Sequence, residues 1–451
     1  MNQDIILNWV ENNKEQIWKN FKTLVQIPSL TGEEAQAQSF VAKHLKALSM
    51  RVEMKEPNIK KLFEKYPEIA QYPSSWQPEL DLPLKFYDIC TYEQLMNSPY
   101  AEKLTYKGRP NVVATLQGTG NGRSLILNGH IDVVTIGDKN RWNCEPFGAQ
   151  EKNGRIYGRG TSDMKGGLWA MITALEAIIR CGISLKGDVI VQSVVNEEHS
   201  GNGSLACVAE GYQADAALVC EPTGSKSYSK TSGGGVYWEM KLTGKEAHTG
   251  SRWKDGKANG ISAIEKTPLL INALLAHEAE ENKEQTKLSL GIGTIKGGDY
   301  ATSTARECVI SGVVYFSPAL GTGVKGIQKV KALFANAIEE ASKNDPWLLE
   351  HKPEVSYLHY DDAYCYPEDS EFASVLCHCG KKVLGKELEE ISFSACDARH
   401  LGNQGGIPVI IYGPGDLSLA HSIDESIDKE DLISAVKVIA CTICDWCGVE
   451  E

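Results

Sequence analysis

Residues 124–134 read SLILNGHIDVV, a short apolar run that leads directly into a histidine and an aspartate. Its composition is typical of a strand in a parallel sheet, where both faces are buried. Comparable runs are NVVATLQ from 111, DVIVQSVV from 188, ADAALVC from 214 and IPVIIYGPG from 407. Helical patterns alternate with these runs, most clearly at 163–182. The alternation predicts an α/β fold with a mostly parallel sheet.

The start of the chain has apolar residues at helical spacing over 2–23 and 34–49, which predicts two helices. Thr31 followed by Glu34 predicts a capping box at the start of the second helix. Residues 55–110 are rich in Pro, Tyr and Lys and fit no regular pattern. We expect them to form a surface insertion.

The pattern changes over residues 229–361, where the order strand, helix, strand, helix, strand predicts a small α+β domain with helices on one face. The α/β pattern returns after 362. We therefore expect a catalytic domain of residues 1–228 plus 362–451, interrupted by an inserted lid domain. Three consecutive domains are the weaker alternative, because the last segment is too short to close its own core.

Composition excludes several classes of protein. The 451 residues carry a formal charge of −13 without a Lys/Arg cluster, which argues against a nucleic-acid partner. No apolar stretch approaches the ~18 residues of a membrane helix, and the N-terminus lacks a signal-peptide pattern, so we expect a cytoplasmic protein without a membrane partner. The 13 cysteines are expected to be reduced thiols. The run Cys441, Cys444 and Cys447 is expected to mark an apolar helix face, with a metal site as the weaker reading.

Residues that can bind metal follow the predicted strands. They are His130 and Asp132, Asp163 before the long helix, Glu197 and Glu198, Glu221, and His421. The carboxyl ends of strands in an open α/β sheet face one crevice, so these side chains can converge. Each signal alone is weak, but five separate strand ends with such residues favour a metal site over solvated loops. Histidine and carboxylate without thiolate suit Zn, Co or Mn.

Coordination chemistry suggests a different role for each of these residues. Two metal ions need a bridging carboxylate, and Asp163 is placed for this role by the start of its helix. One of Glu197 and Glu198 can bind metal while the other acts as general base, and the spacing does not say which. Asp132 can accept the second N–H of the His130 imidazole and so fix its tautomer. No G-x-S-x-G elbow and no Walker Lys-Ser/Thr pair offers a different chemistry.

Several motifs occur together in a fixed order. They are IPSLTGEE (27–34), NGHIDVV (128–134), YGRGTSDMKGG (157–167), NEEHSGNGS (196–204), CEPTG (220–224), GKEAHTGS (244–251), and DARHLGNQGGIPVIIYGPG (397–415) with AHSIDE (420–425). In this order they resemble the co-catalytic metallohydrolase family of acetylornithine deacetylase, succinyl-diaminopimelate desuccinylase, aminoacylase and carboxypeptidase G. The resemblance extends from about residue 20 to 451 and leaves out the 55–110 stretch.

The resemblance implies roles for particular residues. His130, Asp163 and Glu221 would bind one metal ion, and Asp163, Glu198 and His421 the other. Glu197 would be the general base, and Asp132 would orient His130. The family's lid carries a homodimer contact, and its histidine, here His248, would polarise the scissile carbonyl in the partner's active site.

The chain departs from the family where the substrate carboxylate is held. Many members have an Asn after the Gly-Gly of the lid and an Arg in the following strand. Here Thr302 or Ser303 and Tyr315 stand at those places. Anchoring of a carboxylate is therefore in doubt, or it passes to another cation, namely Arg306, Arg252 or Arg399.

The resemblance thus implies a two-metal amidohydrolase, with Zn as the first choice and Co or Mn as alternatives. It would remove an acyl group from a small N-acyl amino acid or related amide. The alternative is a metallopeptidase that cuts dipeptides or a terminal residue. A metal-free binding protein on the same fold is disfavoured, because every expected ligand position is retained.

Overall fold

The computed structural model describes all residues except 1, 72–90, 100, 103, 285 and 451. The chain divides into two compact units. The first holds the described residues of Met1–Asp81, Thr91–Ser232 and Cys365–Glu451, and the second holds Gly233–Tyr364. The second unit overlaps the predicted lid of residues 229–361. Its action as a lid stays a prediction.

The first unit is built on a six-stranded sheet. In spatial order its strands are β1 (Arg51–Lys55), β2 (Asn111–Leu116), β6 (Val189–Val194), β3 (Leu125–His130), β7 (Ala216–Val219) and β18 (Val409–Ile411). The pairs β6–β3, β3–β7 and β7–β18 are parallel, whereas β1–β2 and β2–β6 are antiparallel. The predicted α/β class with a mostly parallel sheet is confirmed.

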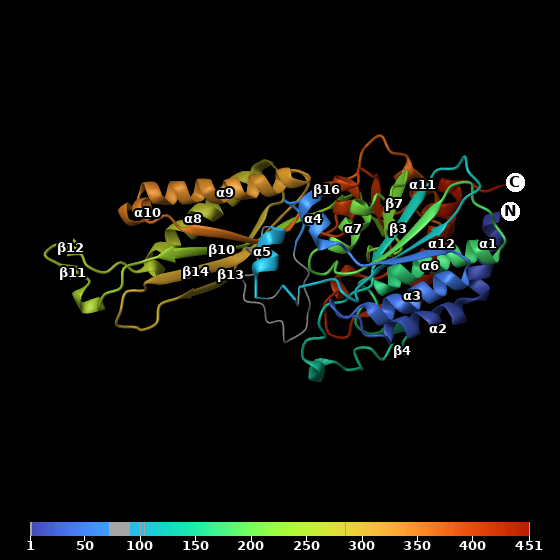
Figure 1. The fold of residues 1–451 in the computed structure, drawn as a ribbon, viewed down its shortest axis with the longest axis horizontal. Helices are drawn as coiled ribbons and strands as arrows, with labels where there is room; N and C mark the ends of the chain where they lie inside the picture. The colour runs from blue at the N-terminus through green and yellow to red at the C-terminus, as the bar shows by residue number, and fades with distance from the viewer. Residues whose placement is uncertain (1, 72–90, 100, 103, 285, 451) are drawn as a thin grey trace. The chain divides into compact units, whose positions relative to one another are not determined.

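Helices cover this sheet (Figure 1). The helices of the first unit are α1 (Asn2–Asn12), α2 (Lys14–Val25), α3 (Ala35–Ala47), α4 (Ile59–Lys65), α5 (Tyr92–Asn97), α6 (Lys165–Arg180), α7 (Asn202–Glu210), α11 (Phe372–Leu384) and α12 (Lys429–Cys447). All six residues of β3 are buried, which requires cover on both faces of the sheet. α6 and α12 pack against each other and against β3, and α7 packs against β6. A separate three-stranded sheet joins β4 (Gln150–Lys152), β5 (Arg155–Tyr157) and β19 (Ser426–Asp428).

Three details near the N-terminus differ from expectation. The predicted helix over 2–23 is two helices that meet at Asn13. The predicted capping box is wrong, because Glu34 makes a buried ion pair with Arg109 and Thr31 donates to Asp132, so neither side chain caps α3. The 55–110 stretch is not only a surface insertion, since its described part contributes α4 and α5 with Leu62, Phe63 and Leu95 buried.

The second unit is an antiparallel four-stranded sheet with helices on one face (Figure 1). The strand order is β13 (Ser289–Gly297), β14 (Glu307–Phe316), β10 (Gly234–Thr243) and β15 (Glu354–Asp361). The helices are α8 (Ala263–Glu281), α9 (Val324–Lys343) and α10 (Pro346–Glu350), and a short hairpin joins β11 (Trp253–Lys254) to β12 (Lys257–Ala258). The rings of Trp238 and Phe334 lie 4.9 Å apart in its core. The sequence prediction missed β13, whose glycine-rich segment SLGIGTIKG has little strand propensity.

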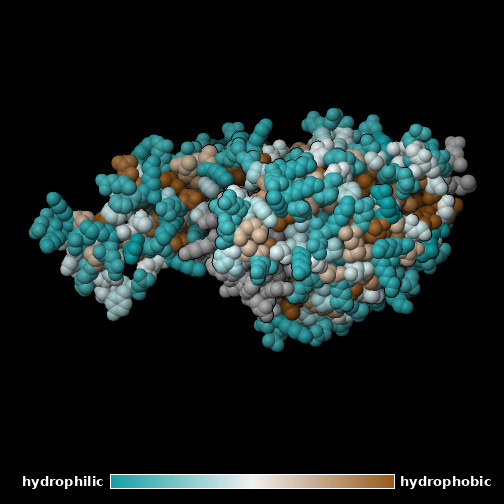
Figure 2. Space-filling view, viewed as in Figure 1, coloured by the Kyte–Doolittle hydropathy of each residue, from teal (hydrophilic) through white to brown (hydrophobic). Residues whose placement is uncertain are grey.

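The viewed face of the molecule shows mostly hydrophilic residues, with apolar ones in small groups (Figure 2). Among the described residues, no helix combines the length and the apolar character that crossing a membrane requires.

Candidate metal centre and active site

The parallel strands bring the predicted metal-binding residues to one edge of the first unit. His130 is the last residue of β3, Glu197 and Glu198 follow β6, and Glu221 follows β7. Because these three strands are parallel neighbours, their carboxyl ends lie at the same edge of the sheet. Asp163 lies just before α6, and His421 lies in the loop before β19. Five separate segments of the chain therefore contribute side chains to one cluster of possible metal ligands.

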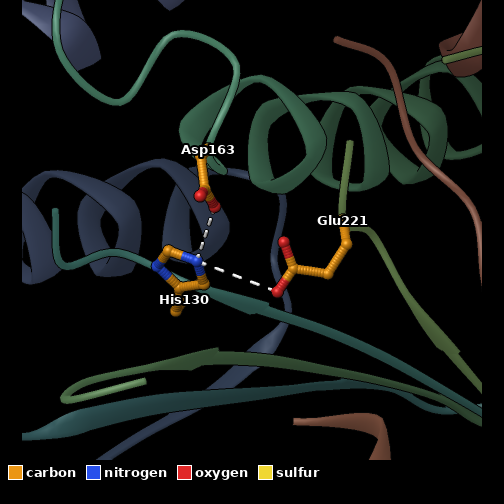
Figure 3. A group of neighbouring side chains, drawn as sticks. All are labelled: His130, Asp163 and Glu221. Carbon is orange, nitrogen blue, oxygen red and sulfur yellow. Dashed lines mark hydrogen bonds and ion pairs between the residues drawn. The ribbon is translucent and has the colours of Figure 1, made fainter. Parts of the chain in front are cut away.

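His130, Asp163 and Glu221 form the first group of possible ligands (Figure 3). The Nε2 atom of His130 lies 3.1 Å from Oδ1 of Asp163 and 3.8 Å from Oε1 of Glu221. All three residues are buried. Their facing atoms have the composition of a three-ligand site for a cation that accepts nitrogen and oxygen.

Asp163, Glu198 and His421 form the second group. The Nε2 atom of His421 lies 3.0 Å from Oε2 of Glu198 and 3.3 Å from Oδ2 of Asp163. Asp163 thus belongs to both groups, with Oδ1 toward His130 and Oδ2 toward His421. This is the arrangement expected of a carboxylate that bridges two metal ions.

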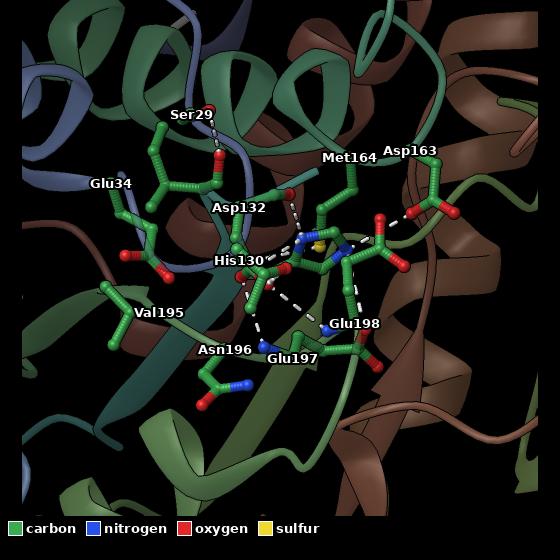
Figure 4. A network of polar contacts seen from close by, with 12 residues as sticks. Ser29, Glu34, His130, Asp132, Asp163, Met164, Val195, Asn196, Glu197 and Glu198 are labelled. Atoms are coloured by element: carbon green, nitrogen blue, oxygen red, sulfur yellow. Dashed lines mark hydrogen bonds and ion pairs between the residues drawn. The ribbon is translucent and has the colours of Figure 1, made fainter. Parts of the chain in front are cut away.

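Asp132 holds the backbone of the two adjacent glutamates (Figure 4). Its Oδ1 accepts the N–H of Glu197 at 3.1 Å, and its Oδ2 accepts the N–H of Glu198 at 3.3 Å and the hydroxyl of Thr31 at 2.7 Å. The Nδ1 atom of His130 lies 2.8 Å from the backbone carbonyl oxygen of Asp132, and 3.8 Å from its carboxylate. The carbonyl therefore accepts the Nδ1–H, which leaves Nε2 of His130 as the atom able to bind a metal.

Glu197 lies beside the two groups without belonging to either. Its Oε2 is 3.8 Å from Nε2 of His130. Burial raises the pKa of Glu197 well above its ordinary value, and the charges of Asp397, Glu221 and Glu198 raise it further, although His130 opposes them. A carboxyl with a raised pKa is a stronger proton acceptor when it is ionised.

Burial and neighbouring negative charge oppose the ionisation of Glu221 and Glu198. Burial raises the pKa of Glu221 well above normal and that of Glu198 to about 7, and in both cases Asp163 adds to the shift. The pKa of His421 rises to about 11, because it bonds to Asp163 and Glu198. The Oε1 atom of Glu198 is buried and accepts no hydrogen bond from any described residue. Excess negative charge and an acceptor without a donor fit the binding of divalent cations.

Sequence reasoning missed two buried carboxylates of this region, Asp397 and Glu425. Asp397 accepts the hydroxyl of Ser204 at 2.6 Å, and burial raises its pKa to about 6. Glu425 binds the backbone of the loop that carries Asp163. Both residues lie in the quoted motifs, at 397–415 and 420–425. Their position in these motifs was the only feature of the sequence that could have indicated a role at the site.

The predicted substrate residues Thr302, Arg306 and Tyr315, and also His248, belong to the second unit. All four are exposed. Nδ1 of His248 accepts the N–H of Gly250 at 3.1 Å, and the hydroxyls of Tyr315 and Tyr237 lie 3.4 Å apart.

The other two candidate cations for a substrate carboxylate already have partners. Arg252 makes two hydrogen bonds to Glu265, at 2.7 and 2.6 Å. Arg399 is buried and donates to the carbonyl of Ser200 at 3.2 Å.

The cysteine run does not form a metal site among the described residues. Cys441, Cys444 and Cys447 lie on α12 and are buried, as expected for an apolar helix face. Among the described residues, only the two groups that share Asp163 bring three possible ligands together. Burial raises the pKa of Cys441 to about 11 and that of Cys447 to about 12, so both remain thiols.

A mostly parallel sheet with histidines and carboxylates clustered at its strand ends is typical of metal-dependent hydrolases. Comparison with known proteins agrees, since the model of peptidase family M20/M25/M40 matches residues 126–445. The chain therefore belongs to this family, whose members hydrolyse amide bonds, and the predicted family resemblance and enzyme class are confirmed.

One curated relative is the N-formyl-4-amino-5-aminomethyl-2-methylpyrimidine deformylase of Halalkalibacterium halodurans. It is 33% identical over an alignment of 388 residues, and the match covers 78% of this chain and 88% of the relative. A second, named a probable succinyl-diaminopimelate desuccinylase of Staphylococcus aureus, is 26% identical over 78% of this chain and 90% of its own.

Among solved structures, a tripeptidase from Staphylococcus aureus matches with a TM-score of 0.69 and 20% identity, covering 95% of this chain and 97% of that one. At this identity the match shows the fold alone.

Proposed function

We propose that the protein is a two-metal deacylase that hydrolyses the C–N bond of a small N-acyl amide. The observation that carries the proposal is the position of Asp163, whose two carboxylate oxygens face two separate groups of ligands. His130 and Glu221 complete one proposed site, and Glu198 and His421 the other. Zn²⁺ is the proposed metal, with Co²⁺ and Mn²⁺ as alternatives for the same ligands.

Two bound cations would lower the pKa of a water molecule and offset the charge of the oxyanion. Glu197 is the proposed general base. It takes a proton from the attacking water and returns it to the leaving nitrogen as the C–N bond breaks. Asp132 holds the N–H of Glu197 and so supports its orientation.

The proposed substrate has no α-carboxylate on its amine side. By the family resemblance, Thr302 or Ser303 and Tyr315 stand where many family members have the Asn and Arg that hold such a carboxylate. Of the three arginines named as candidate cations, Arg252 and Arg399 are already paired within the chain, which leaves Arg306, exposed on the second unit. The relative with 33% identity is named for removing a formyl group from an aminomethylpyrimidine, and this supports an aminomethyl group on a heteroaromatic ring as the leaving amine.

The test is a comparison of kcat/KM across acyl amides. N-formyl-aminomethylpyrimidine should exceed N-formyl, N-acetyl and N-succinyl amino acids by at least about tenfold. The variant T302N/Y315R should gain activity on N-acyl amino acids, and Y315F serves as the control without a new cation. A clear preference for dipeptides would instead support the peptidase alternative, and a preference for N-acyl amino acids would overturn the proposed substrate class.

We also propose a homodimer whose contact lies in the second unit. Ile264, Leu269 and Leu275 on α8 and Ile295 on β13 are exposed apolar residues of this unit and support the proposal. The role of His248 in the partner's active site rests on the family resemblance. Every described cysteine is free of a disulfide, which supports a reducing compartment such as the cytoplasm.

A further inference from the structure

Glu425 is a fully buried carboxylate in the loop between His421 and β19. Its Oε1 accepts the N–H of Ser162 at 2.8 Å and the N–H of Asp163 at 3.0 Å. Its Oε2 accepts the N–H of Gly160 at 3.0 Å and a guanidinium N–H of Arg159 at 2.7 Å. Each carboxylate oxygen therefore accepts two hydrogen bonds. Three of the four donors are backbone N–H groups of one loop, residues 158–163.

Other bonds join the 158–163 loop to the segment 416–425, which contains both His421 and Glu425. The N–H of Gly158 donates to the carbonyl of Glu425 at 2.8 Å. The N–H of Asp416 donates to the hydroxyl of Ser162 at 2.8 Å, and that hydroxyl donates to the carbonyl of Asp416 at 3.0 Å. The loop that carries Asp163 is thus fixed to the loop that carries His421 at several points.

This contact matters because Asp163 is the residue shared by the two ligand groups. A bond to the backbone N–H of Asp163 limits rotation of the peptide from which its side chain projects. Charge-assisted bonds to a buried carboxylate are about twice as strong as neutral ones, so the restraint is stiff. His421 lies in the same loop as Glu425, so one residue restrains the relative position of both ligands.

We propose that Glu425 is a positioning residue that sets the relative placement of Asp163 and His421 and thereby the affinity for both metal ions. This inference rests on the proposed two-metal function. Arg159 balances the charge of Glu425, whereas the bonds to backbone N–H groups do the positioning. A purely structural Glu425 would change stability and leave metal affinity unaltered.

The test titrates metal-stripped protein with Zn²⁺ by calorimetry and with Co²⁺ by visible absorption, which reports coordination geometry. Glu425→Gln should weaken both binding events by about 10- to 100-fold and alter the Co²⁺ spectrum. Glu176→Gln is the matched control. It also breaks a partly buried contact, from Glu176 to His44 at 3.0 Å, but touches no ligand loop, so its metal affinity should equal that of the wild type.

The possible results separate the two proposals. A wild-type protein that binds no metal would contradict the proposed function. A wild type that binds two ions, with Glu425→Gln binding equally tightly, would overturn only the role of Glu425. If Glu425→Gln does not fold, Glu425→Asp retains the charge but withdraws the oxygens by one methylene, and at least about tenfold weaker binding is expected.

Hydrogen exchange of the metal-free wild type needs no variant. The amides of Ser162 and Asp163 should exchange slowly, and rapid exchange at both would also overturn the inference.

Discussion

The side chain of Asp163 faces both groups of possible metal ligands. Its oxygens lie 3.1 Å from Nε2 of His130 and 3.3 Å from Nε2 of His421. A carboxylate can do this because its two oxygens point in different directions, whereas an imidazole or thiolate presents one ligand atom at a time. Bonds to both histidines lower the pKa of Asp163 although burial opposes this, so it is the acid of the cluster most readily ionised.

Glu197 and Glu198 are neighbours in sequence with different surroundings. Glu198 contacts His421 and belongs to a ligand group, whereas Glu197 does not. Asp132 accepts both of their N–H groups, so it fixes the peptide between them. The sequence alone left open which glutamate would bind metal, and the resemblance assigned Glu198. The observed contacts support that assignment.

The first prediction concerns Glu197. Glu197→Gln should lower kcat by at least about 10²-fold, because an amide cannot accept the proton of the attacking water. The amide has nearly the same size, and Glu197 belongs to neither ligand group, so bound metal should stay at the wild-type level. Turnover is measured beside metal analysis of the same sample. Retention of a tenth or more of the activity with full metal content would refute the base assignment.

Among the elements, β3 and α12 followed local sequence rules most closely. β3 begins with the apolar residues Leu125–Leu127, and its buried position follows from them. α12 begins where Asp428 accepts the N–H groups of Glu430 and Asp431, a cap that the sequence encodes locally. Tertiary contacts, rather than local sequence patterns, determine β13 and the start of α3. Strand β13 pairs with β14 despite its glycines, and Glu34 contacts Arg109 in place of the helix end.

The second prediction concerns the cysteine run on α12. Cys441→Ala, Cys444→Ala and Cys447→Ala should each leave the metal stoichiometry of the protein unchanged. Each should lower the free energy of unfolding by about 1 kcal/mol, because each removes a buried sulfur from a packed helix face. Metal analysis and denaturant unfolding provide the two measurements. Loss of a metal equivalent in any variant would show that the run binds metal.

The whole chain consists of two units with separate cores. The sequence predicted this division from the change of pattern near 229 and its reversal near 362. All proposed metal ligands lie in the first unit. Metal binding should therefore stabilise the first unit selectively.

The third prediction follows from that separation. Removing the metal with a chelator should lower the midpoint of thermal unfolding of the first unit. A free metal concentration of 1,000 times Kd corresponds to about 4 kcal/mol of stabilisation. Calorimetry with hydrogen exchange should locate the loss of protection in the first unit, and residues 233–364 should keep theirs. An equal loss in both units, or no shift in the midpoint, would contradict the prediction.

The sequence by itself determined the α/β class, the insertion and the identity of the candidate ligands. These depend on local patterns, namely apolar runs, helical spacing and ligand-type residues at strand ends. The tertiary structure decided which atoms meet. It showed that the Asp132 carbonyl holds His130 while its carboxylate holds the two glutamates, and that Glu425 holds the Asp163 loop. Such contacts join residues up to 266 positions apart, and no local pattern encodes a bond across that separation.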